Sequence, residues 1–160
     1  EKGNKCFNLD STRIKWCGLY QKWYQNGQLN YERKDTLNML LYEKTWYSNG
    51  VLFNERIYDN GKLKQSTSWF DNGKIKLEGT YIMGAKDGEF KQYHASGVLH
   101  VKCIFKDDVM EGSYERFHEN GVLASKGQVK DNEQDGEWQY FDELGNLTET
   151  RIYSNGVMKE

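Results

Sequence analysis

The sequence predicts an all-β protein, an elongated antiparallel meander of tandem β-hairpin repeats with about 12 strands and no substantial helix. Three observations lead to this prediction. A turn dipeptide recurs along the chain, apolar residues lie at fixed distances from it, and the 160 residues include no proline. Proline lacks the backbone N–H that paired strands use, so a chain that is nearly all paired strand excludes it.

The turn dipeptide is Asn-Gly, which occurs six times, while Ser96-Gly97 and Leu144-Gly145 fill two gaps in the series. Successive glycines are separated by 23, 11, 12, 24, 24, 24 and 11 residues. These intervals indicate a unit of about 12 residues in which some turns lack the dipeptide. Asn-Gly readily takes positive φ at both central positions of a type I′ turn. We therefore expect two-residue hairpin turns at Gly27, Gly50, Gly61, Gly73, Gly97, Gly121, Gly145 and Gly156.

Apolar side chains keep a fixed distance from each glycine. An aliphatic residue follows two positions later, and an apolar, mostly aromatic residue precedes by four positions. Alternation after the turn predicts that Leu99, Val101, Cys103 and Phe105 share one face of the sheet. The turns that lack the dipeptide are expected in three polar stretches, residues 84–87, 107–110 and 131–135.

The array is predicted to form one unit, since the chain is long enough for one ordinary domain. We assign residues 18–160 to the tandem hairpin array and residues 1–17 to an N-terminal cap or irregular segment. Residues 35–41 fit the repeat poorly, and we expect irregular structure there. Aromatic residues make up 14% of the chain, which argues against disorder because disordered chains are poor in large burying groups.

Two aromatic rows are predicted on opposite faces of the sheet. Four copies contain the pattern Gly-x-aromatic-x-x-aromatic-x-x-x-Gly, and strand residues three positions apart point to opposite faces. A single-layer sheet cannot bury both faces, so either it curls and shelters one row, or one row remains available as a contact surface. The candidate contact aromatics are Trp23, Tyr24, Trp46, Tyr47, Trp69, Phe70, Tyr93 and Phe117.

No catalytic, metal or cofactor site is predicted, and we expect a protein that is not an enzyme. His94 and His118 occupy the same position in repeats 24 residues apart. Strand spacing would place them about 10 Å apart, too far for one metal ion to bridge. We assign both to a surface row equivalent to Tyr24. A row of glutamates, Glu32, Glu55 and Glu78, is expected at solvated strand positions opposite Lys or Arg.

Charge and cysteine content limit the partners and the location. The net charge is −2 with acidic and basic residues interspersed, which excludes nucleic acid as an expected partner. Cys6, Cys17 and Cys103 show neither the CxxC spacing nor the spacing of zinc ligands. Cys6 and Cys17 could form a disulfide, or all three cysteines could be structural or free thiols.

The chain opens with Glu1 instead of Met. We favour an exported or cell-surface bacterial protein, while a cytoplasmic location stays open.

The repeat resembles a known family. Its core is similar to Tyr-x-x-Asn-Gly-x-Leu, although at residues 24–27 only one residue separates Tyr from Asn. Asp-Gly-Glu-Phe at 87–90 and Asp-Gly-Glu-Trp at 135–138 are expected to form the intervening turns. These features resemble the bacterial variant of the MORN repeat, found in proteins labelled YwqK-family antitoxins, over residues 18–158. Leu144, Arg33 and Asp35 depart from the pattern. The resemblance implies a twisted hairpin array that contacts proteins or membranes and has no catalytic residues.

The expected function is a non-catalytic repeat protein acting as a protein–protein interaction scaffold or adhesin-like module of the cell envelope. A flat, extended sheet offers many weak contacts that sum to affinity. Two alternatives remain open at this point. Arrays could associate with one another into a homo-oligomeric structural protein, or exposed aromatics could bind carbohydrate, cell wall or a membrane surface.

Overall fold

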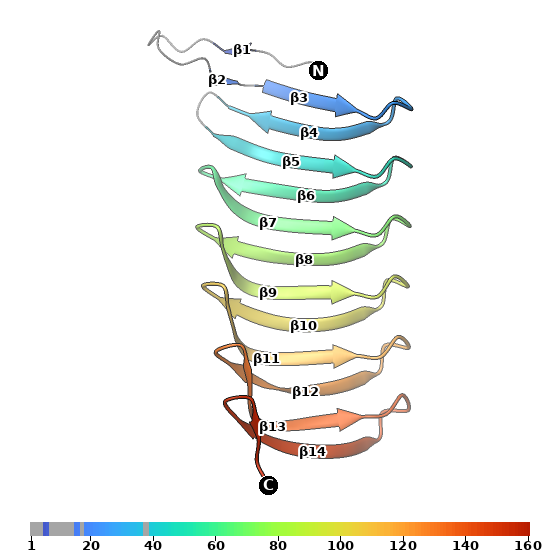
Figure 1. Ribbon diagram of the computed structural model, residues 1–160, viewed down its shortest axis with the longest axis vertical. Helices are drawn as coiled ribbons and strands as arrows, with labels where there is room; N and C mark the ends of the chain where they lie inside the picture. The colour runs from blue at the N-terminus through green and yellow to red at the C-terminus, as the bar shows by residue number, and fades with distance from the viewer. Residues whose placement is uncertain (1–4, 7–14, 17, 37–38) are drawn as a thin grey trace.

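The computed structural model describes residues 5–6, 15–16, 18–36 and 39–160. Thirteen strands, β3 to β15, form one antiparallel sheet in which every strand pairs with its neighbours in sequence, and β1 pairs with β2 (Figure 1). None of the described residues is helical, and so none belongs to a helix that could cross a membrane. The predicted all-β meander is confirmed, with thirteen strands in its main sheet.

The strands are short and of similar length. Their bounds are β1 Lys5–Cys6, β2 Lys15–Trp16, β3 Gly18–Trp23, β4 Leu29–Asp35, β5 Leu40–Trp46, β6 Leu52–Asp59, β7 Lys62–Trp69, β8 Ile75–Ile82, β9 Ala85–Tyr93, β10 Leu99–Lys106, β11 Val109–Phe117, β12 Leu123–Lys130, β13 Glu133–Phe141, β14 Leu147–Ser154 and β15 Val157–Met158. Residues 37–38 of the irregular segment expected at 35–41 lie outside the described residues; Asp35 ends β4, and Leu40 begins β5.

The two edges of the sheet use different turns, which corrects the prediction of one turn type. At the edge on the right of Figure 1, the Gly27 N–H donates to the Tyr24 carbonyl (3.0 Å) and the Tyr24 N–H donates to the Gln28 carbonyl (2.8 Å). Only the glycine has positive φ there, +83°. This is a three-residue loop, and it recurs at Gly50, Gly73, Gly97, Gly121 and Gly145. The type I′ prediction is wrong at these six glycines.

Asparagine serves these loops through its side chain instead of its backbone. The Asn49 Oδ1 accepts the Val51 N–H (3.0 Å), and the Asn49 Nδ2 donates to the Asp71 carbonyl in the next loop (3.0 Å). Asn26, Asn72 and Asn120 make the same pair of bonds. The asparagines therefore join four of the five successive pairs of these loops along the edge.

The opposite edge contains the two-residue turns. Both central residues have positive φ at Asn60-Gly61, Met83-Gly84, Asp107-Asp108, Asp131-Asn132 and Asn155-Gly156. The type I′ prediction is therefore right at Gly61 and Gly156. The stretches expected to hold the remaining turns do so at 107–108 and 131–132, but the first turn begins one residue early, at Met83. Residues 87–90 and 135–138, expected to form turns, lie inside β9 and β13.

Bulges near this edge account for the unequal spacing of the repeats. One extra residue is inserted in β7 opposite β6, whereas two are inserted in β9, β11 and β13 opposite the preceding strands. Gly88, Gly112 and Gly136 lie in the larger bulges at φ between +72° and +99°, a conformation that glycine adopts without steric cost. The unit is therefore a two-stranded hairpin of 23 or 24 residues.

A second bulge follows every three-residue loop and corrects one predicted face. Leu99 pairs with Tyr93, while Val101 pairs with Gln92. Tyr93 and Gln92 are adjacent on β9 and point to opposite faces. Leu99 therefore does not share a face with Val101 and Cys103, as alternation alone had predicted.

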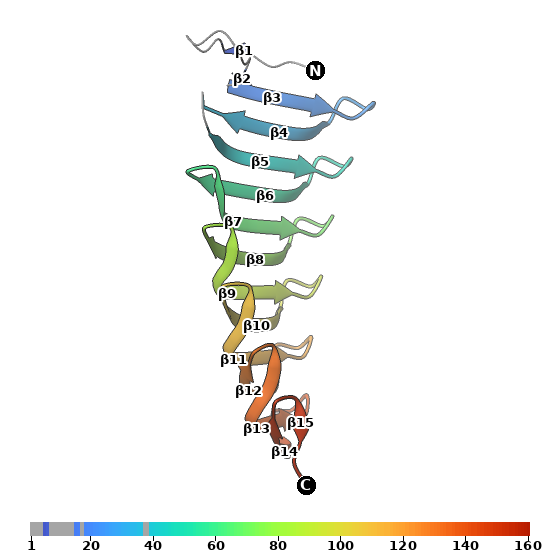
Figure 2. The ribbon, with the colours of Figure 1, turned by 60° about the vertical axis from the view of Figure 1, so that its left-hand side comes forward.

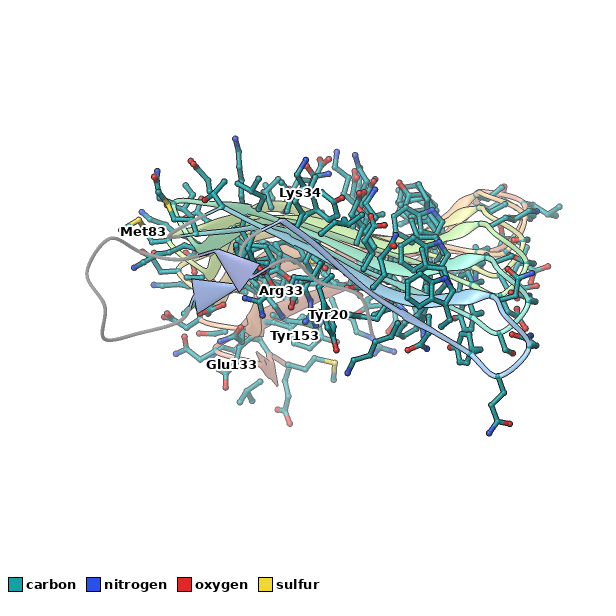
Figure 3. The ribbon with its side chains drawn as sticks, turned by 90° about the horizontal axis from the view of Figure 1, so that it is seen from above. Tyr20, Arg33, Lys34, Met83, Glu133 and Tyr153 are labelled. Carbon is teal, nitrogen blue, oxygen red and sulfur yellow. The ribbon has the colours of Figure 1, made fainter. Side chains whose placement is uncertain are left out.

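The sheet twists along its length and curls toward one face, here called the inner face (Figure 2). Tyr20, Arg33 and Tyr153 lie on this face, and Lys34 lies on the other, outer face (Figure 3). Trp138 is only 3% exposed and packs with Val129 and Tyr153. A ring on a flat single layer could not be buried so completely, so the curl provides the core.

Small residues on the inner face make room for the rings. A Cβ added at Gly127 would lie 2.4 Å from the Trp138 ring, and one added at Gly79 would lie 2.2 Å from the Phe90 ring. Each ring therefore lies against the bare backbone of the neighbouring strand. Phe90 in turn packs edge to face on Phe105, with ring centroids 4.9 Å apart, an arrangement that aromatic pairs favour.

Gly127→Ala is expected to lower the free energy of unfolding by about 1–3 kcal/mol, because the Trp138 ring must move. The loss should be smaller in a Trp138→Tyr background. In the preceding hairpin a tyrosine, Tyr114, already lies opposite a residue with a Cβ, Cys103, so a tyrosine ring at 138 should tolerate the Cβ of alanine at 127. Urea unfolding of the two single variants and the double variant measures this coupling. Additive losses would contradict direct contact as the cause.

Met83→Asn is expected to raise the free energy of unfolding by about 0.5–1 kcal/mol, because Met83 occupies a left-handed conformation that asparagine tolerates better. Its φ is +55° and it is 72% exposed at the edge of the sheet (Figure 3). Asn60→Met at the equivalent turn is the matched control and should have the opposite effect. The urea midpoint measures both, and a midpoint lowered by Met83→Asn would refute the argument.

Candidate functional site

The register of the sheet places one residue from each of β3 to β14 in a single line along the inner face, here called the central row. Its members are successive partners across the sheet, with the Trp138 ring lying over Gly127. The central row comprises Tyr20, Arg33, Glu43, Arg56, Ser66, Gly79, Phe90, Cys103, Tyr114, Gly127, Trp138 and Arg151.

The central row changes character along the array. From Gly79 to Trp138 it alternates small and aromatic residues, and these rings form the buried core. In the first two hairpins the same positions hold Arg33, Glu43 and Arg56. Charged side chains replace the ring and its small partner there, so the first hairpins present a polar inner face and the last ones an apolar one.

Glu43 is held between two tyrosines from neighbouring strands. The Tyr31 hydroxyl donates to one carboxylate oxygen (2.8 Å), and the Tyr58 hydroxyl donates to the other (2.7 Å). Burial, followed by these bonds and the negative charge of Glu43, raises the pKa of Tyr31 and of Tyr58 to about 12. Both oxygens of the carboxylate are therefore already engaged within the fold.

The two arginines beside Glu43 differ in their availability. Arg33 forms a two-pronged ion pair with the buried Asp35 through its Nε (2.7 Å) and Nη2 (2.9 Å). Arg56 is exposed and forms no ion pair with any described residue, although a side-chain hydrogen bond to Tyr58 and its charge partly offset the rise in the pKa of that tyrosine, and its charge also partly offsets the rise in the pKa of Tyr81. Arg56 is thus the charged residue of this cluster that is open to a ligand.

Further cations lie on the inner face without carboxylate partners among the described residues. The Lys86 ammonium lies 4.7 Å from the centroid of the Phe105 ring, and the Lys22 ammonium lies 5.6 Å from that of Tyr20. Arg116 pairs in register with Val101 and Ser125 and is exposed. We call Lys22, Arg56, Lys86 and Arg116 the inner cations.

Several charges of the outer face are paired. Lys44 forms an ion pair with Glu55 (2.7 Å), and Glu89 binds both Lys91 and Lys102. The prediction that the glutamates of the row lie opposite Lys or Arg is confirmed, since each one faces a lysine. Glu32 and Glu55 each have Lys44 as a register partner, and Glu78 has Lys91. Glu32 also accepts a hydrogen bond from the Tyr42 hydroxyl, and Glu78 accepts one from the Tyr93 hydroxyl.

The candidate contact aromatics lie away from the inner face. Trp23, Trp46, Trp69, Tyr93 and Phe117 end the odd-numbered strands, each opposite a leucine or isoleucine. Trp23 is 43% exposed, and the other four are half-buried. We call this line the outer aromatic row.

Tyr24, Tyr47 and Phe70 begin the three-residue loops at the edge of the sheet. The Tyr24 and Tyr47 hydroxyls donate to the Trp46 and Trp69 carbonyls, at 2.6 and 3.0 Å. These side chains therefore connect successive hairpins. Of the predicted glycines, Gly27, Gly50, Gly73, Gly97, Gly121 and Gly145 lie at this edge, and Gly61 and Gly156 lie at the other.

The histidines follow the position of Tyr24, as expected. Nε2 of His94 lies 3.3 Å from the Phe117 carbonyl oxygen, and Nε2 of His118 lies 2.9 Å from that of Phe141. His94 also stacks on His100, with ring centroids 4.2 Å apart. The part of the chain that the structure describes contains no group of three His, Cys, Asp or Glu side chains placed to hold a metal ion.

A shallow groove crosses the apolar half of the inner face. It measures about 360 Å³ and is lined by Tyr114, Arg116, Gln134, Trp138 and Tyr140, among others. The buried Trp138 ring is fixed by a hydrogen bond from its Nε1 to the Gln128 carbonyl (3.0 Å). The groove is open and lies on a surface of aromatic rings beside the Arg116 guanidinium.

The inner cations are the residues that the sequence prediction missed. A signal for them exists, since Arg56 occupies the row position that Gly79, Cys103 and Gly127 occupy in later hairpins. Recognising that equivalence requires the strand register, because the bulges shift it within each hairpin. The Cys6–Cys17 disulfide considered from the sequence lies outside the described side chains, and Cys103 is a free, buried thiol.

Glu43→Gln is expected to weaken the dependence of stability on alkaline pH. Because the Tyr31 and Tyr58 pKa values are raised to about 12 from the ordinary value near 10, their contribution is complete below pH ~10 and is lost as pH rises toward 12. Removing the Glu43 charge brings both pKa values down. Urea midpoints across this range should fall less steeply in Glu43→Gln than in the wild type. Glu137→Gln, whose carboxylate contacts Gln139, should keep the wild-type slope.

Comparison with known proteins identifies the repeat. The MORN repeat variant family matches residues 16–34, 65–83, 86–107, 110–131 and 134–155, together more than half of the chain. No curated protein matches it. The crystal structure of TarM is aligned at 10% identity with a TM-score of 0.22, over 81% of this chain and 21% of that chain, so this chain spans about a fifth of TarM. With its hairpins and five matched segments, this chain belongs to the MORN repeat variant family.

Proposed function

We propose that the array is a non-catalytic interaction module that binds a protein partner along its inner face. The observation that supports this most directly is the combination of exposed arginines and aromatic rings on the inner face. Arg56 and Arg116 are exposed there with no ion pair to a described residue, on the same face as the rings of Phe90, Tyr114 and Trp138. Unpaired charge beside aromatic rings is typical of binding surfaces, where Arg, Tyr and Trp supply most of the affinity.

The family comparison supports the same proposal. The unmatched stretch, residues 35–64, contains Glu43, Arg56 and Tyr58, which belong to the polar part of the inner face. A hairpin in which Glu43 stands in place of a buried ring, and Arg56 in place of its small partner, buries less apolar surface. Contact of Arg56 with a partner would offset this loss.

The outer aromatic row supports the alternatives, self-association and glycan or membrane binding, less well. Its rings are half-buried opposite aliphatic side chains, except at Trp23. A glycan-binding platform needs an open ring face. Both an adhesin-like role and an antitoxin-like role would use a bound protein, and the inner face offers either of them a continuous surface.

The proposal predicts that a partner depends on the inner face specifically. The full chain, an Arg56→Gln/Arg116→Gln variant and a Lys34→Gln/Lys102→Gln outer-face control are immobilised, and polypeptides retained from a cell extract are compared. The two variants lose equal charge. Wild type and control should retain a shared polypeptide that the inner-face variant loses by at least about tenfold, as expected for hot-spot arginines. Equal retention by all three, or retention by none, would contradict the proposal.

A further inference from the structure

We infer that the inner face takes an extended acidic polypeptide segment that lies along the array, across the strands, with carboxylates at about every fourth residue. This inference rests on the proposed function and specifies its ligand. It follows from the charge of the face, from the spacing of the inner cations and from the shape of the sheet.

The charge of the inner face favours an anionic ligand. Three carboxylates on this face are engaged within the fold. Asp35 binds Arg33, Glu43 binds two tyrosine hydroxyls, and Glu149 binds Arg151 (2.7 Å). The four inner cations have no carboxylate partner among the described residues. A ligand that supplies carboxylates would pair with these four cations.

Aromatic rings hold some of these cations in place. The Lys86 ammonium lies over both Phe105 (4.7 Å) and Phe90 (5.7 Å), and Lys22 lies over Tyr20. Contact with a ring restricts a flexible lysine and reduces its hydration, so less entropy is lost when a carboxylate binds it. The rings between the cations also offer apolar contacts to the residues between the carboxylates of the ligand.

The spacing of the cations sets the spacing of the carboxylates. Three strand steps separate Arg56 on β6 from Lys86 on β9, and two separate Lys86 from Arg116 on β11. At about 4.8 Å per strand these steps correspond to roughly 14 and 10 Å along the array. Lys86 lies beside Phe105 and Arg116 beside Val101, on opposite sides of the central row, so these values are the smallest separations of the cations. An extended chain advances about 3.3–3.6 Å per residue, so its carboxylates must be at least three to four residues apart.

The shape of the sheet favours a polypeptide over a membrane. The sheet curls around the inner face and twists along its length (Figures 2 and 3). A flat anionic bilayer touches the rim of such a surface and leaves a cation of the central row, such as Arg56, out of reach. A single extended chain follows the curl and the twist together.

The test uses the full-length chain and a fluorescein-labelled peptide of sixteen residues, with Glu at every fourth position and Ser, Thr or Leu between. Fluorescence anisotropy compares it with a peptide of the same composition whose four glutamates are adjacent. We expect the spaced peptide to bind at least about threefold more tightly, with affinity falling as salt increases. Arg56→Gln and Arg116→Gln should each weaken binding by about five- to tenfold, whereas Lys34→Gln and Lys102→Gln on the outer face should leave it unchanged.

Three outcomes would overturn the inference: equal binding of the two peptides, equal effects of the inner and outer variants, or binding to vesicles with anionic lipid that depends on Arg56 while the peptides do not bind. The partner captured by the intact chain separates this inference from the proposed function. If capture depends on Arg56 and Arg116 but the spaced peptide does not bind, the acidic ligand is wrong and the interaction module stands. If neither depends on them, both fail.

Discussion

A sheet of one layer has no second layer to bury its side chains, and this constraint determines most of the structure. The chain meets it by curling, so that rings on one face cover one another, and by placing small residues where a ring must lie flat on the backbone. Gly127 beneath Trp138 and Gly79 beneath Phe90 are the clearest cases. Because every strand contributes one residue to the central row, each position in a hairpin is either part of this core or open for another use.

The first two hairpins show the other use. There a carboxylate, Glu43, replaces the ring and is only partly exposed, which is unfavourable unless hydrogen-bond donors replace water. Tyr31 and Tyr58 supply them. Polar networks of this kind add little net stability compared with an apolar core, but they fix side chains in defined positions. The array thus has a well-packed half, which supports the sheet, and a polar half, which presents Arg56.

The fold was predictable from the sequence, because Asn-Gly, alternation and the absence of proline are local signals. The turn type at six glycines was not, since at four of them the asparagine before the glycine bonds to a loop 22 or 23 residues away. The inner cations were missed for a related reason. The alternation of side chains assigns residues to the two faces of the sheet only along an unbroken strand. Each hairpin contains bulges that change which residues point to which face, as between Leu99 and Val101. The wider family supplied the repeat boundaries but leaves Arg56 outside its matched segments.

The bulges at the two-residue-turn edge have a consequence for how such proteins diversify. In an ordinary strand, gaining or losing a single codon turns every later side chain to the wrong side. Here β7 accommodates one surplus residue and β9 two, yet Ser66 and Phe90 occupy the same row. Short insertions and deletions are therefore absorbed where they occur, and gene duplication can produce hairpins of unequal length that still align. Loss of a ring in one hairpin is then tolerated by its neighbours while a new surface is selected.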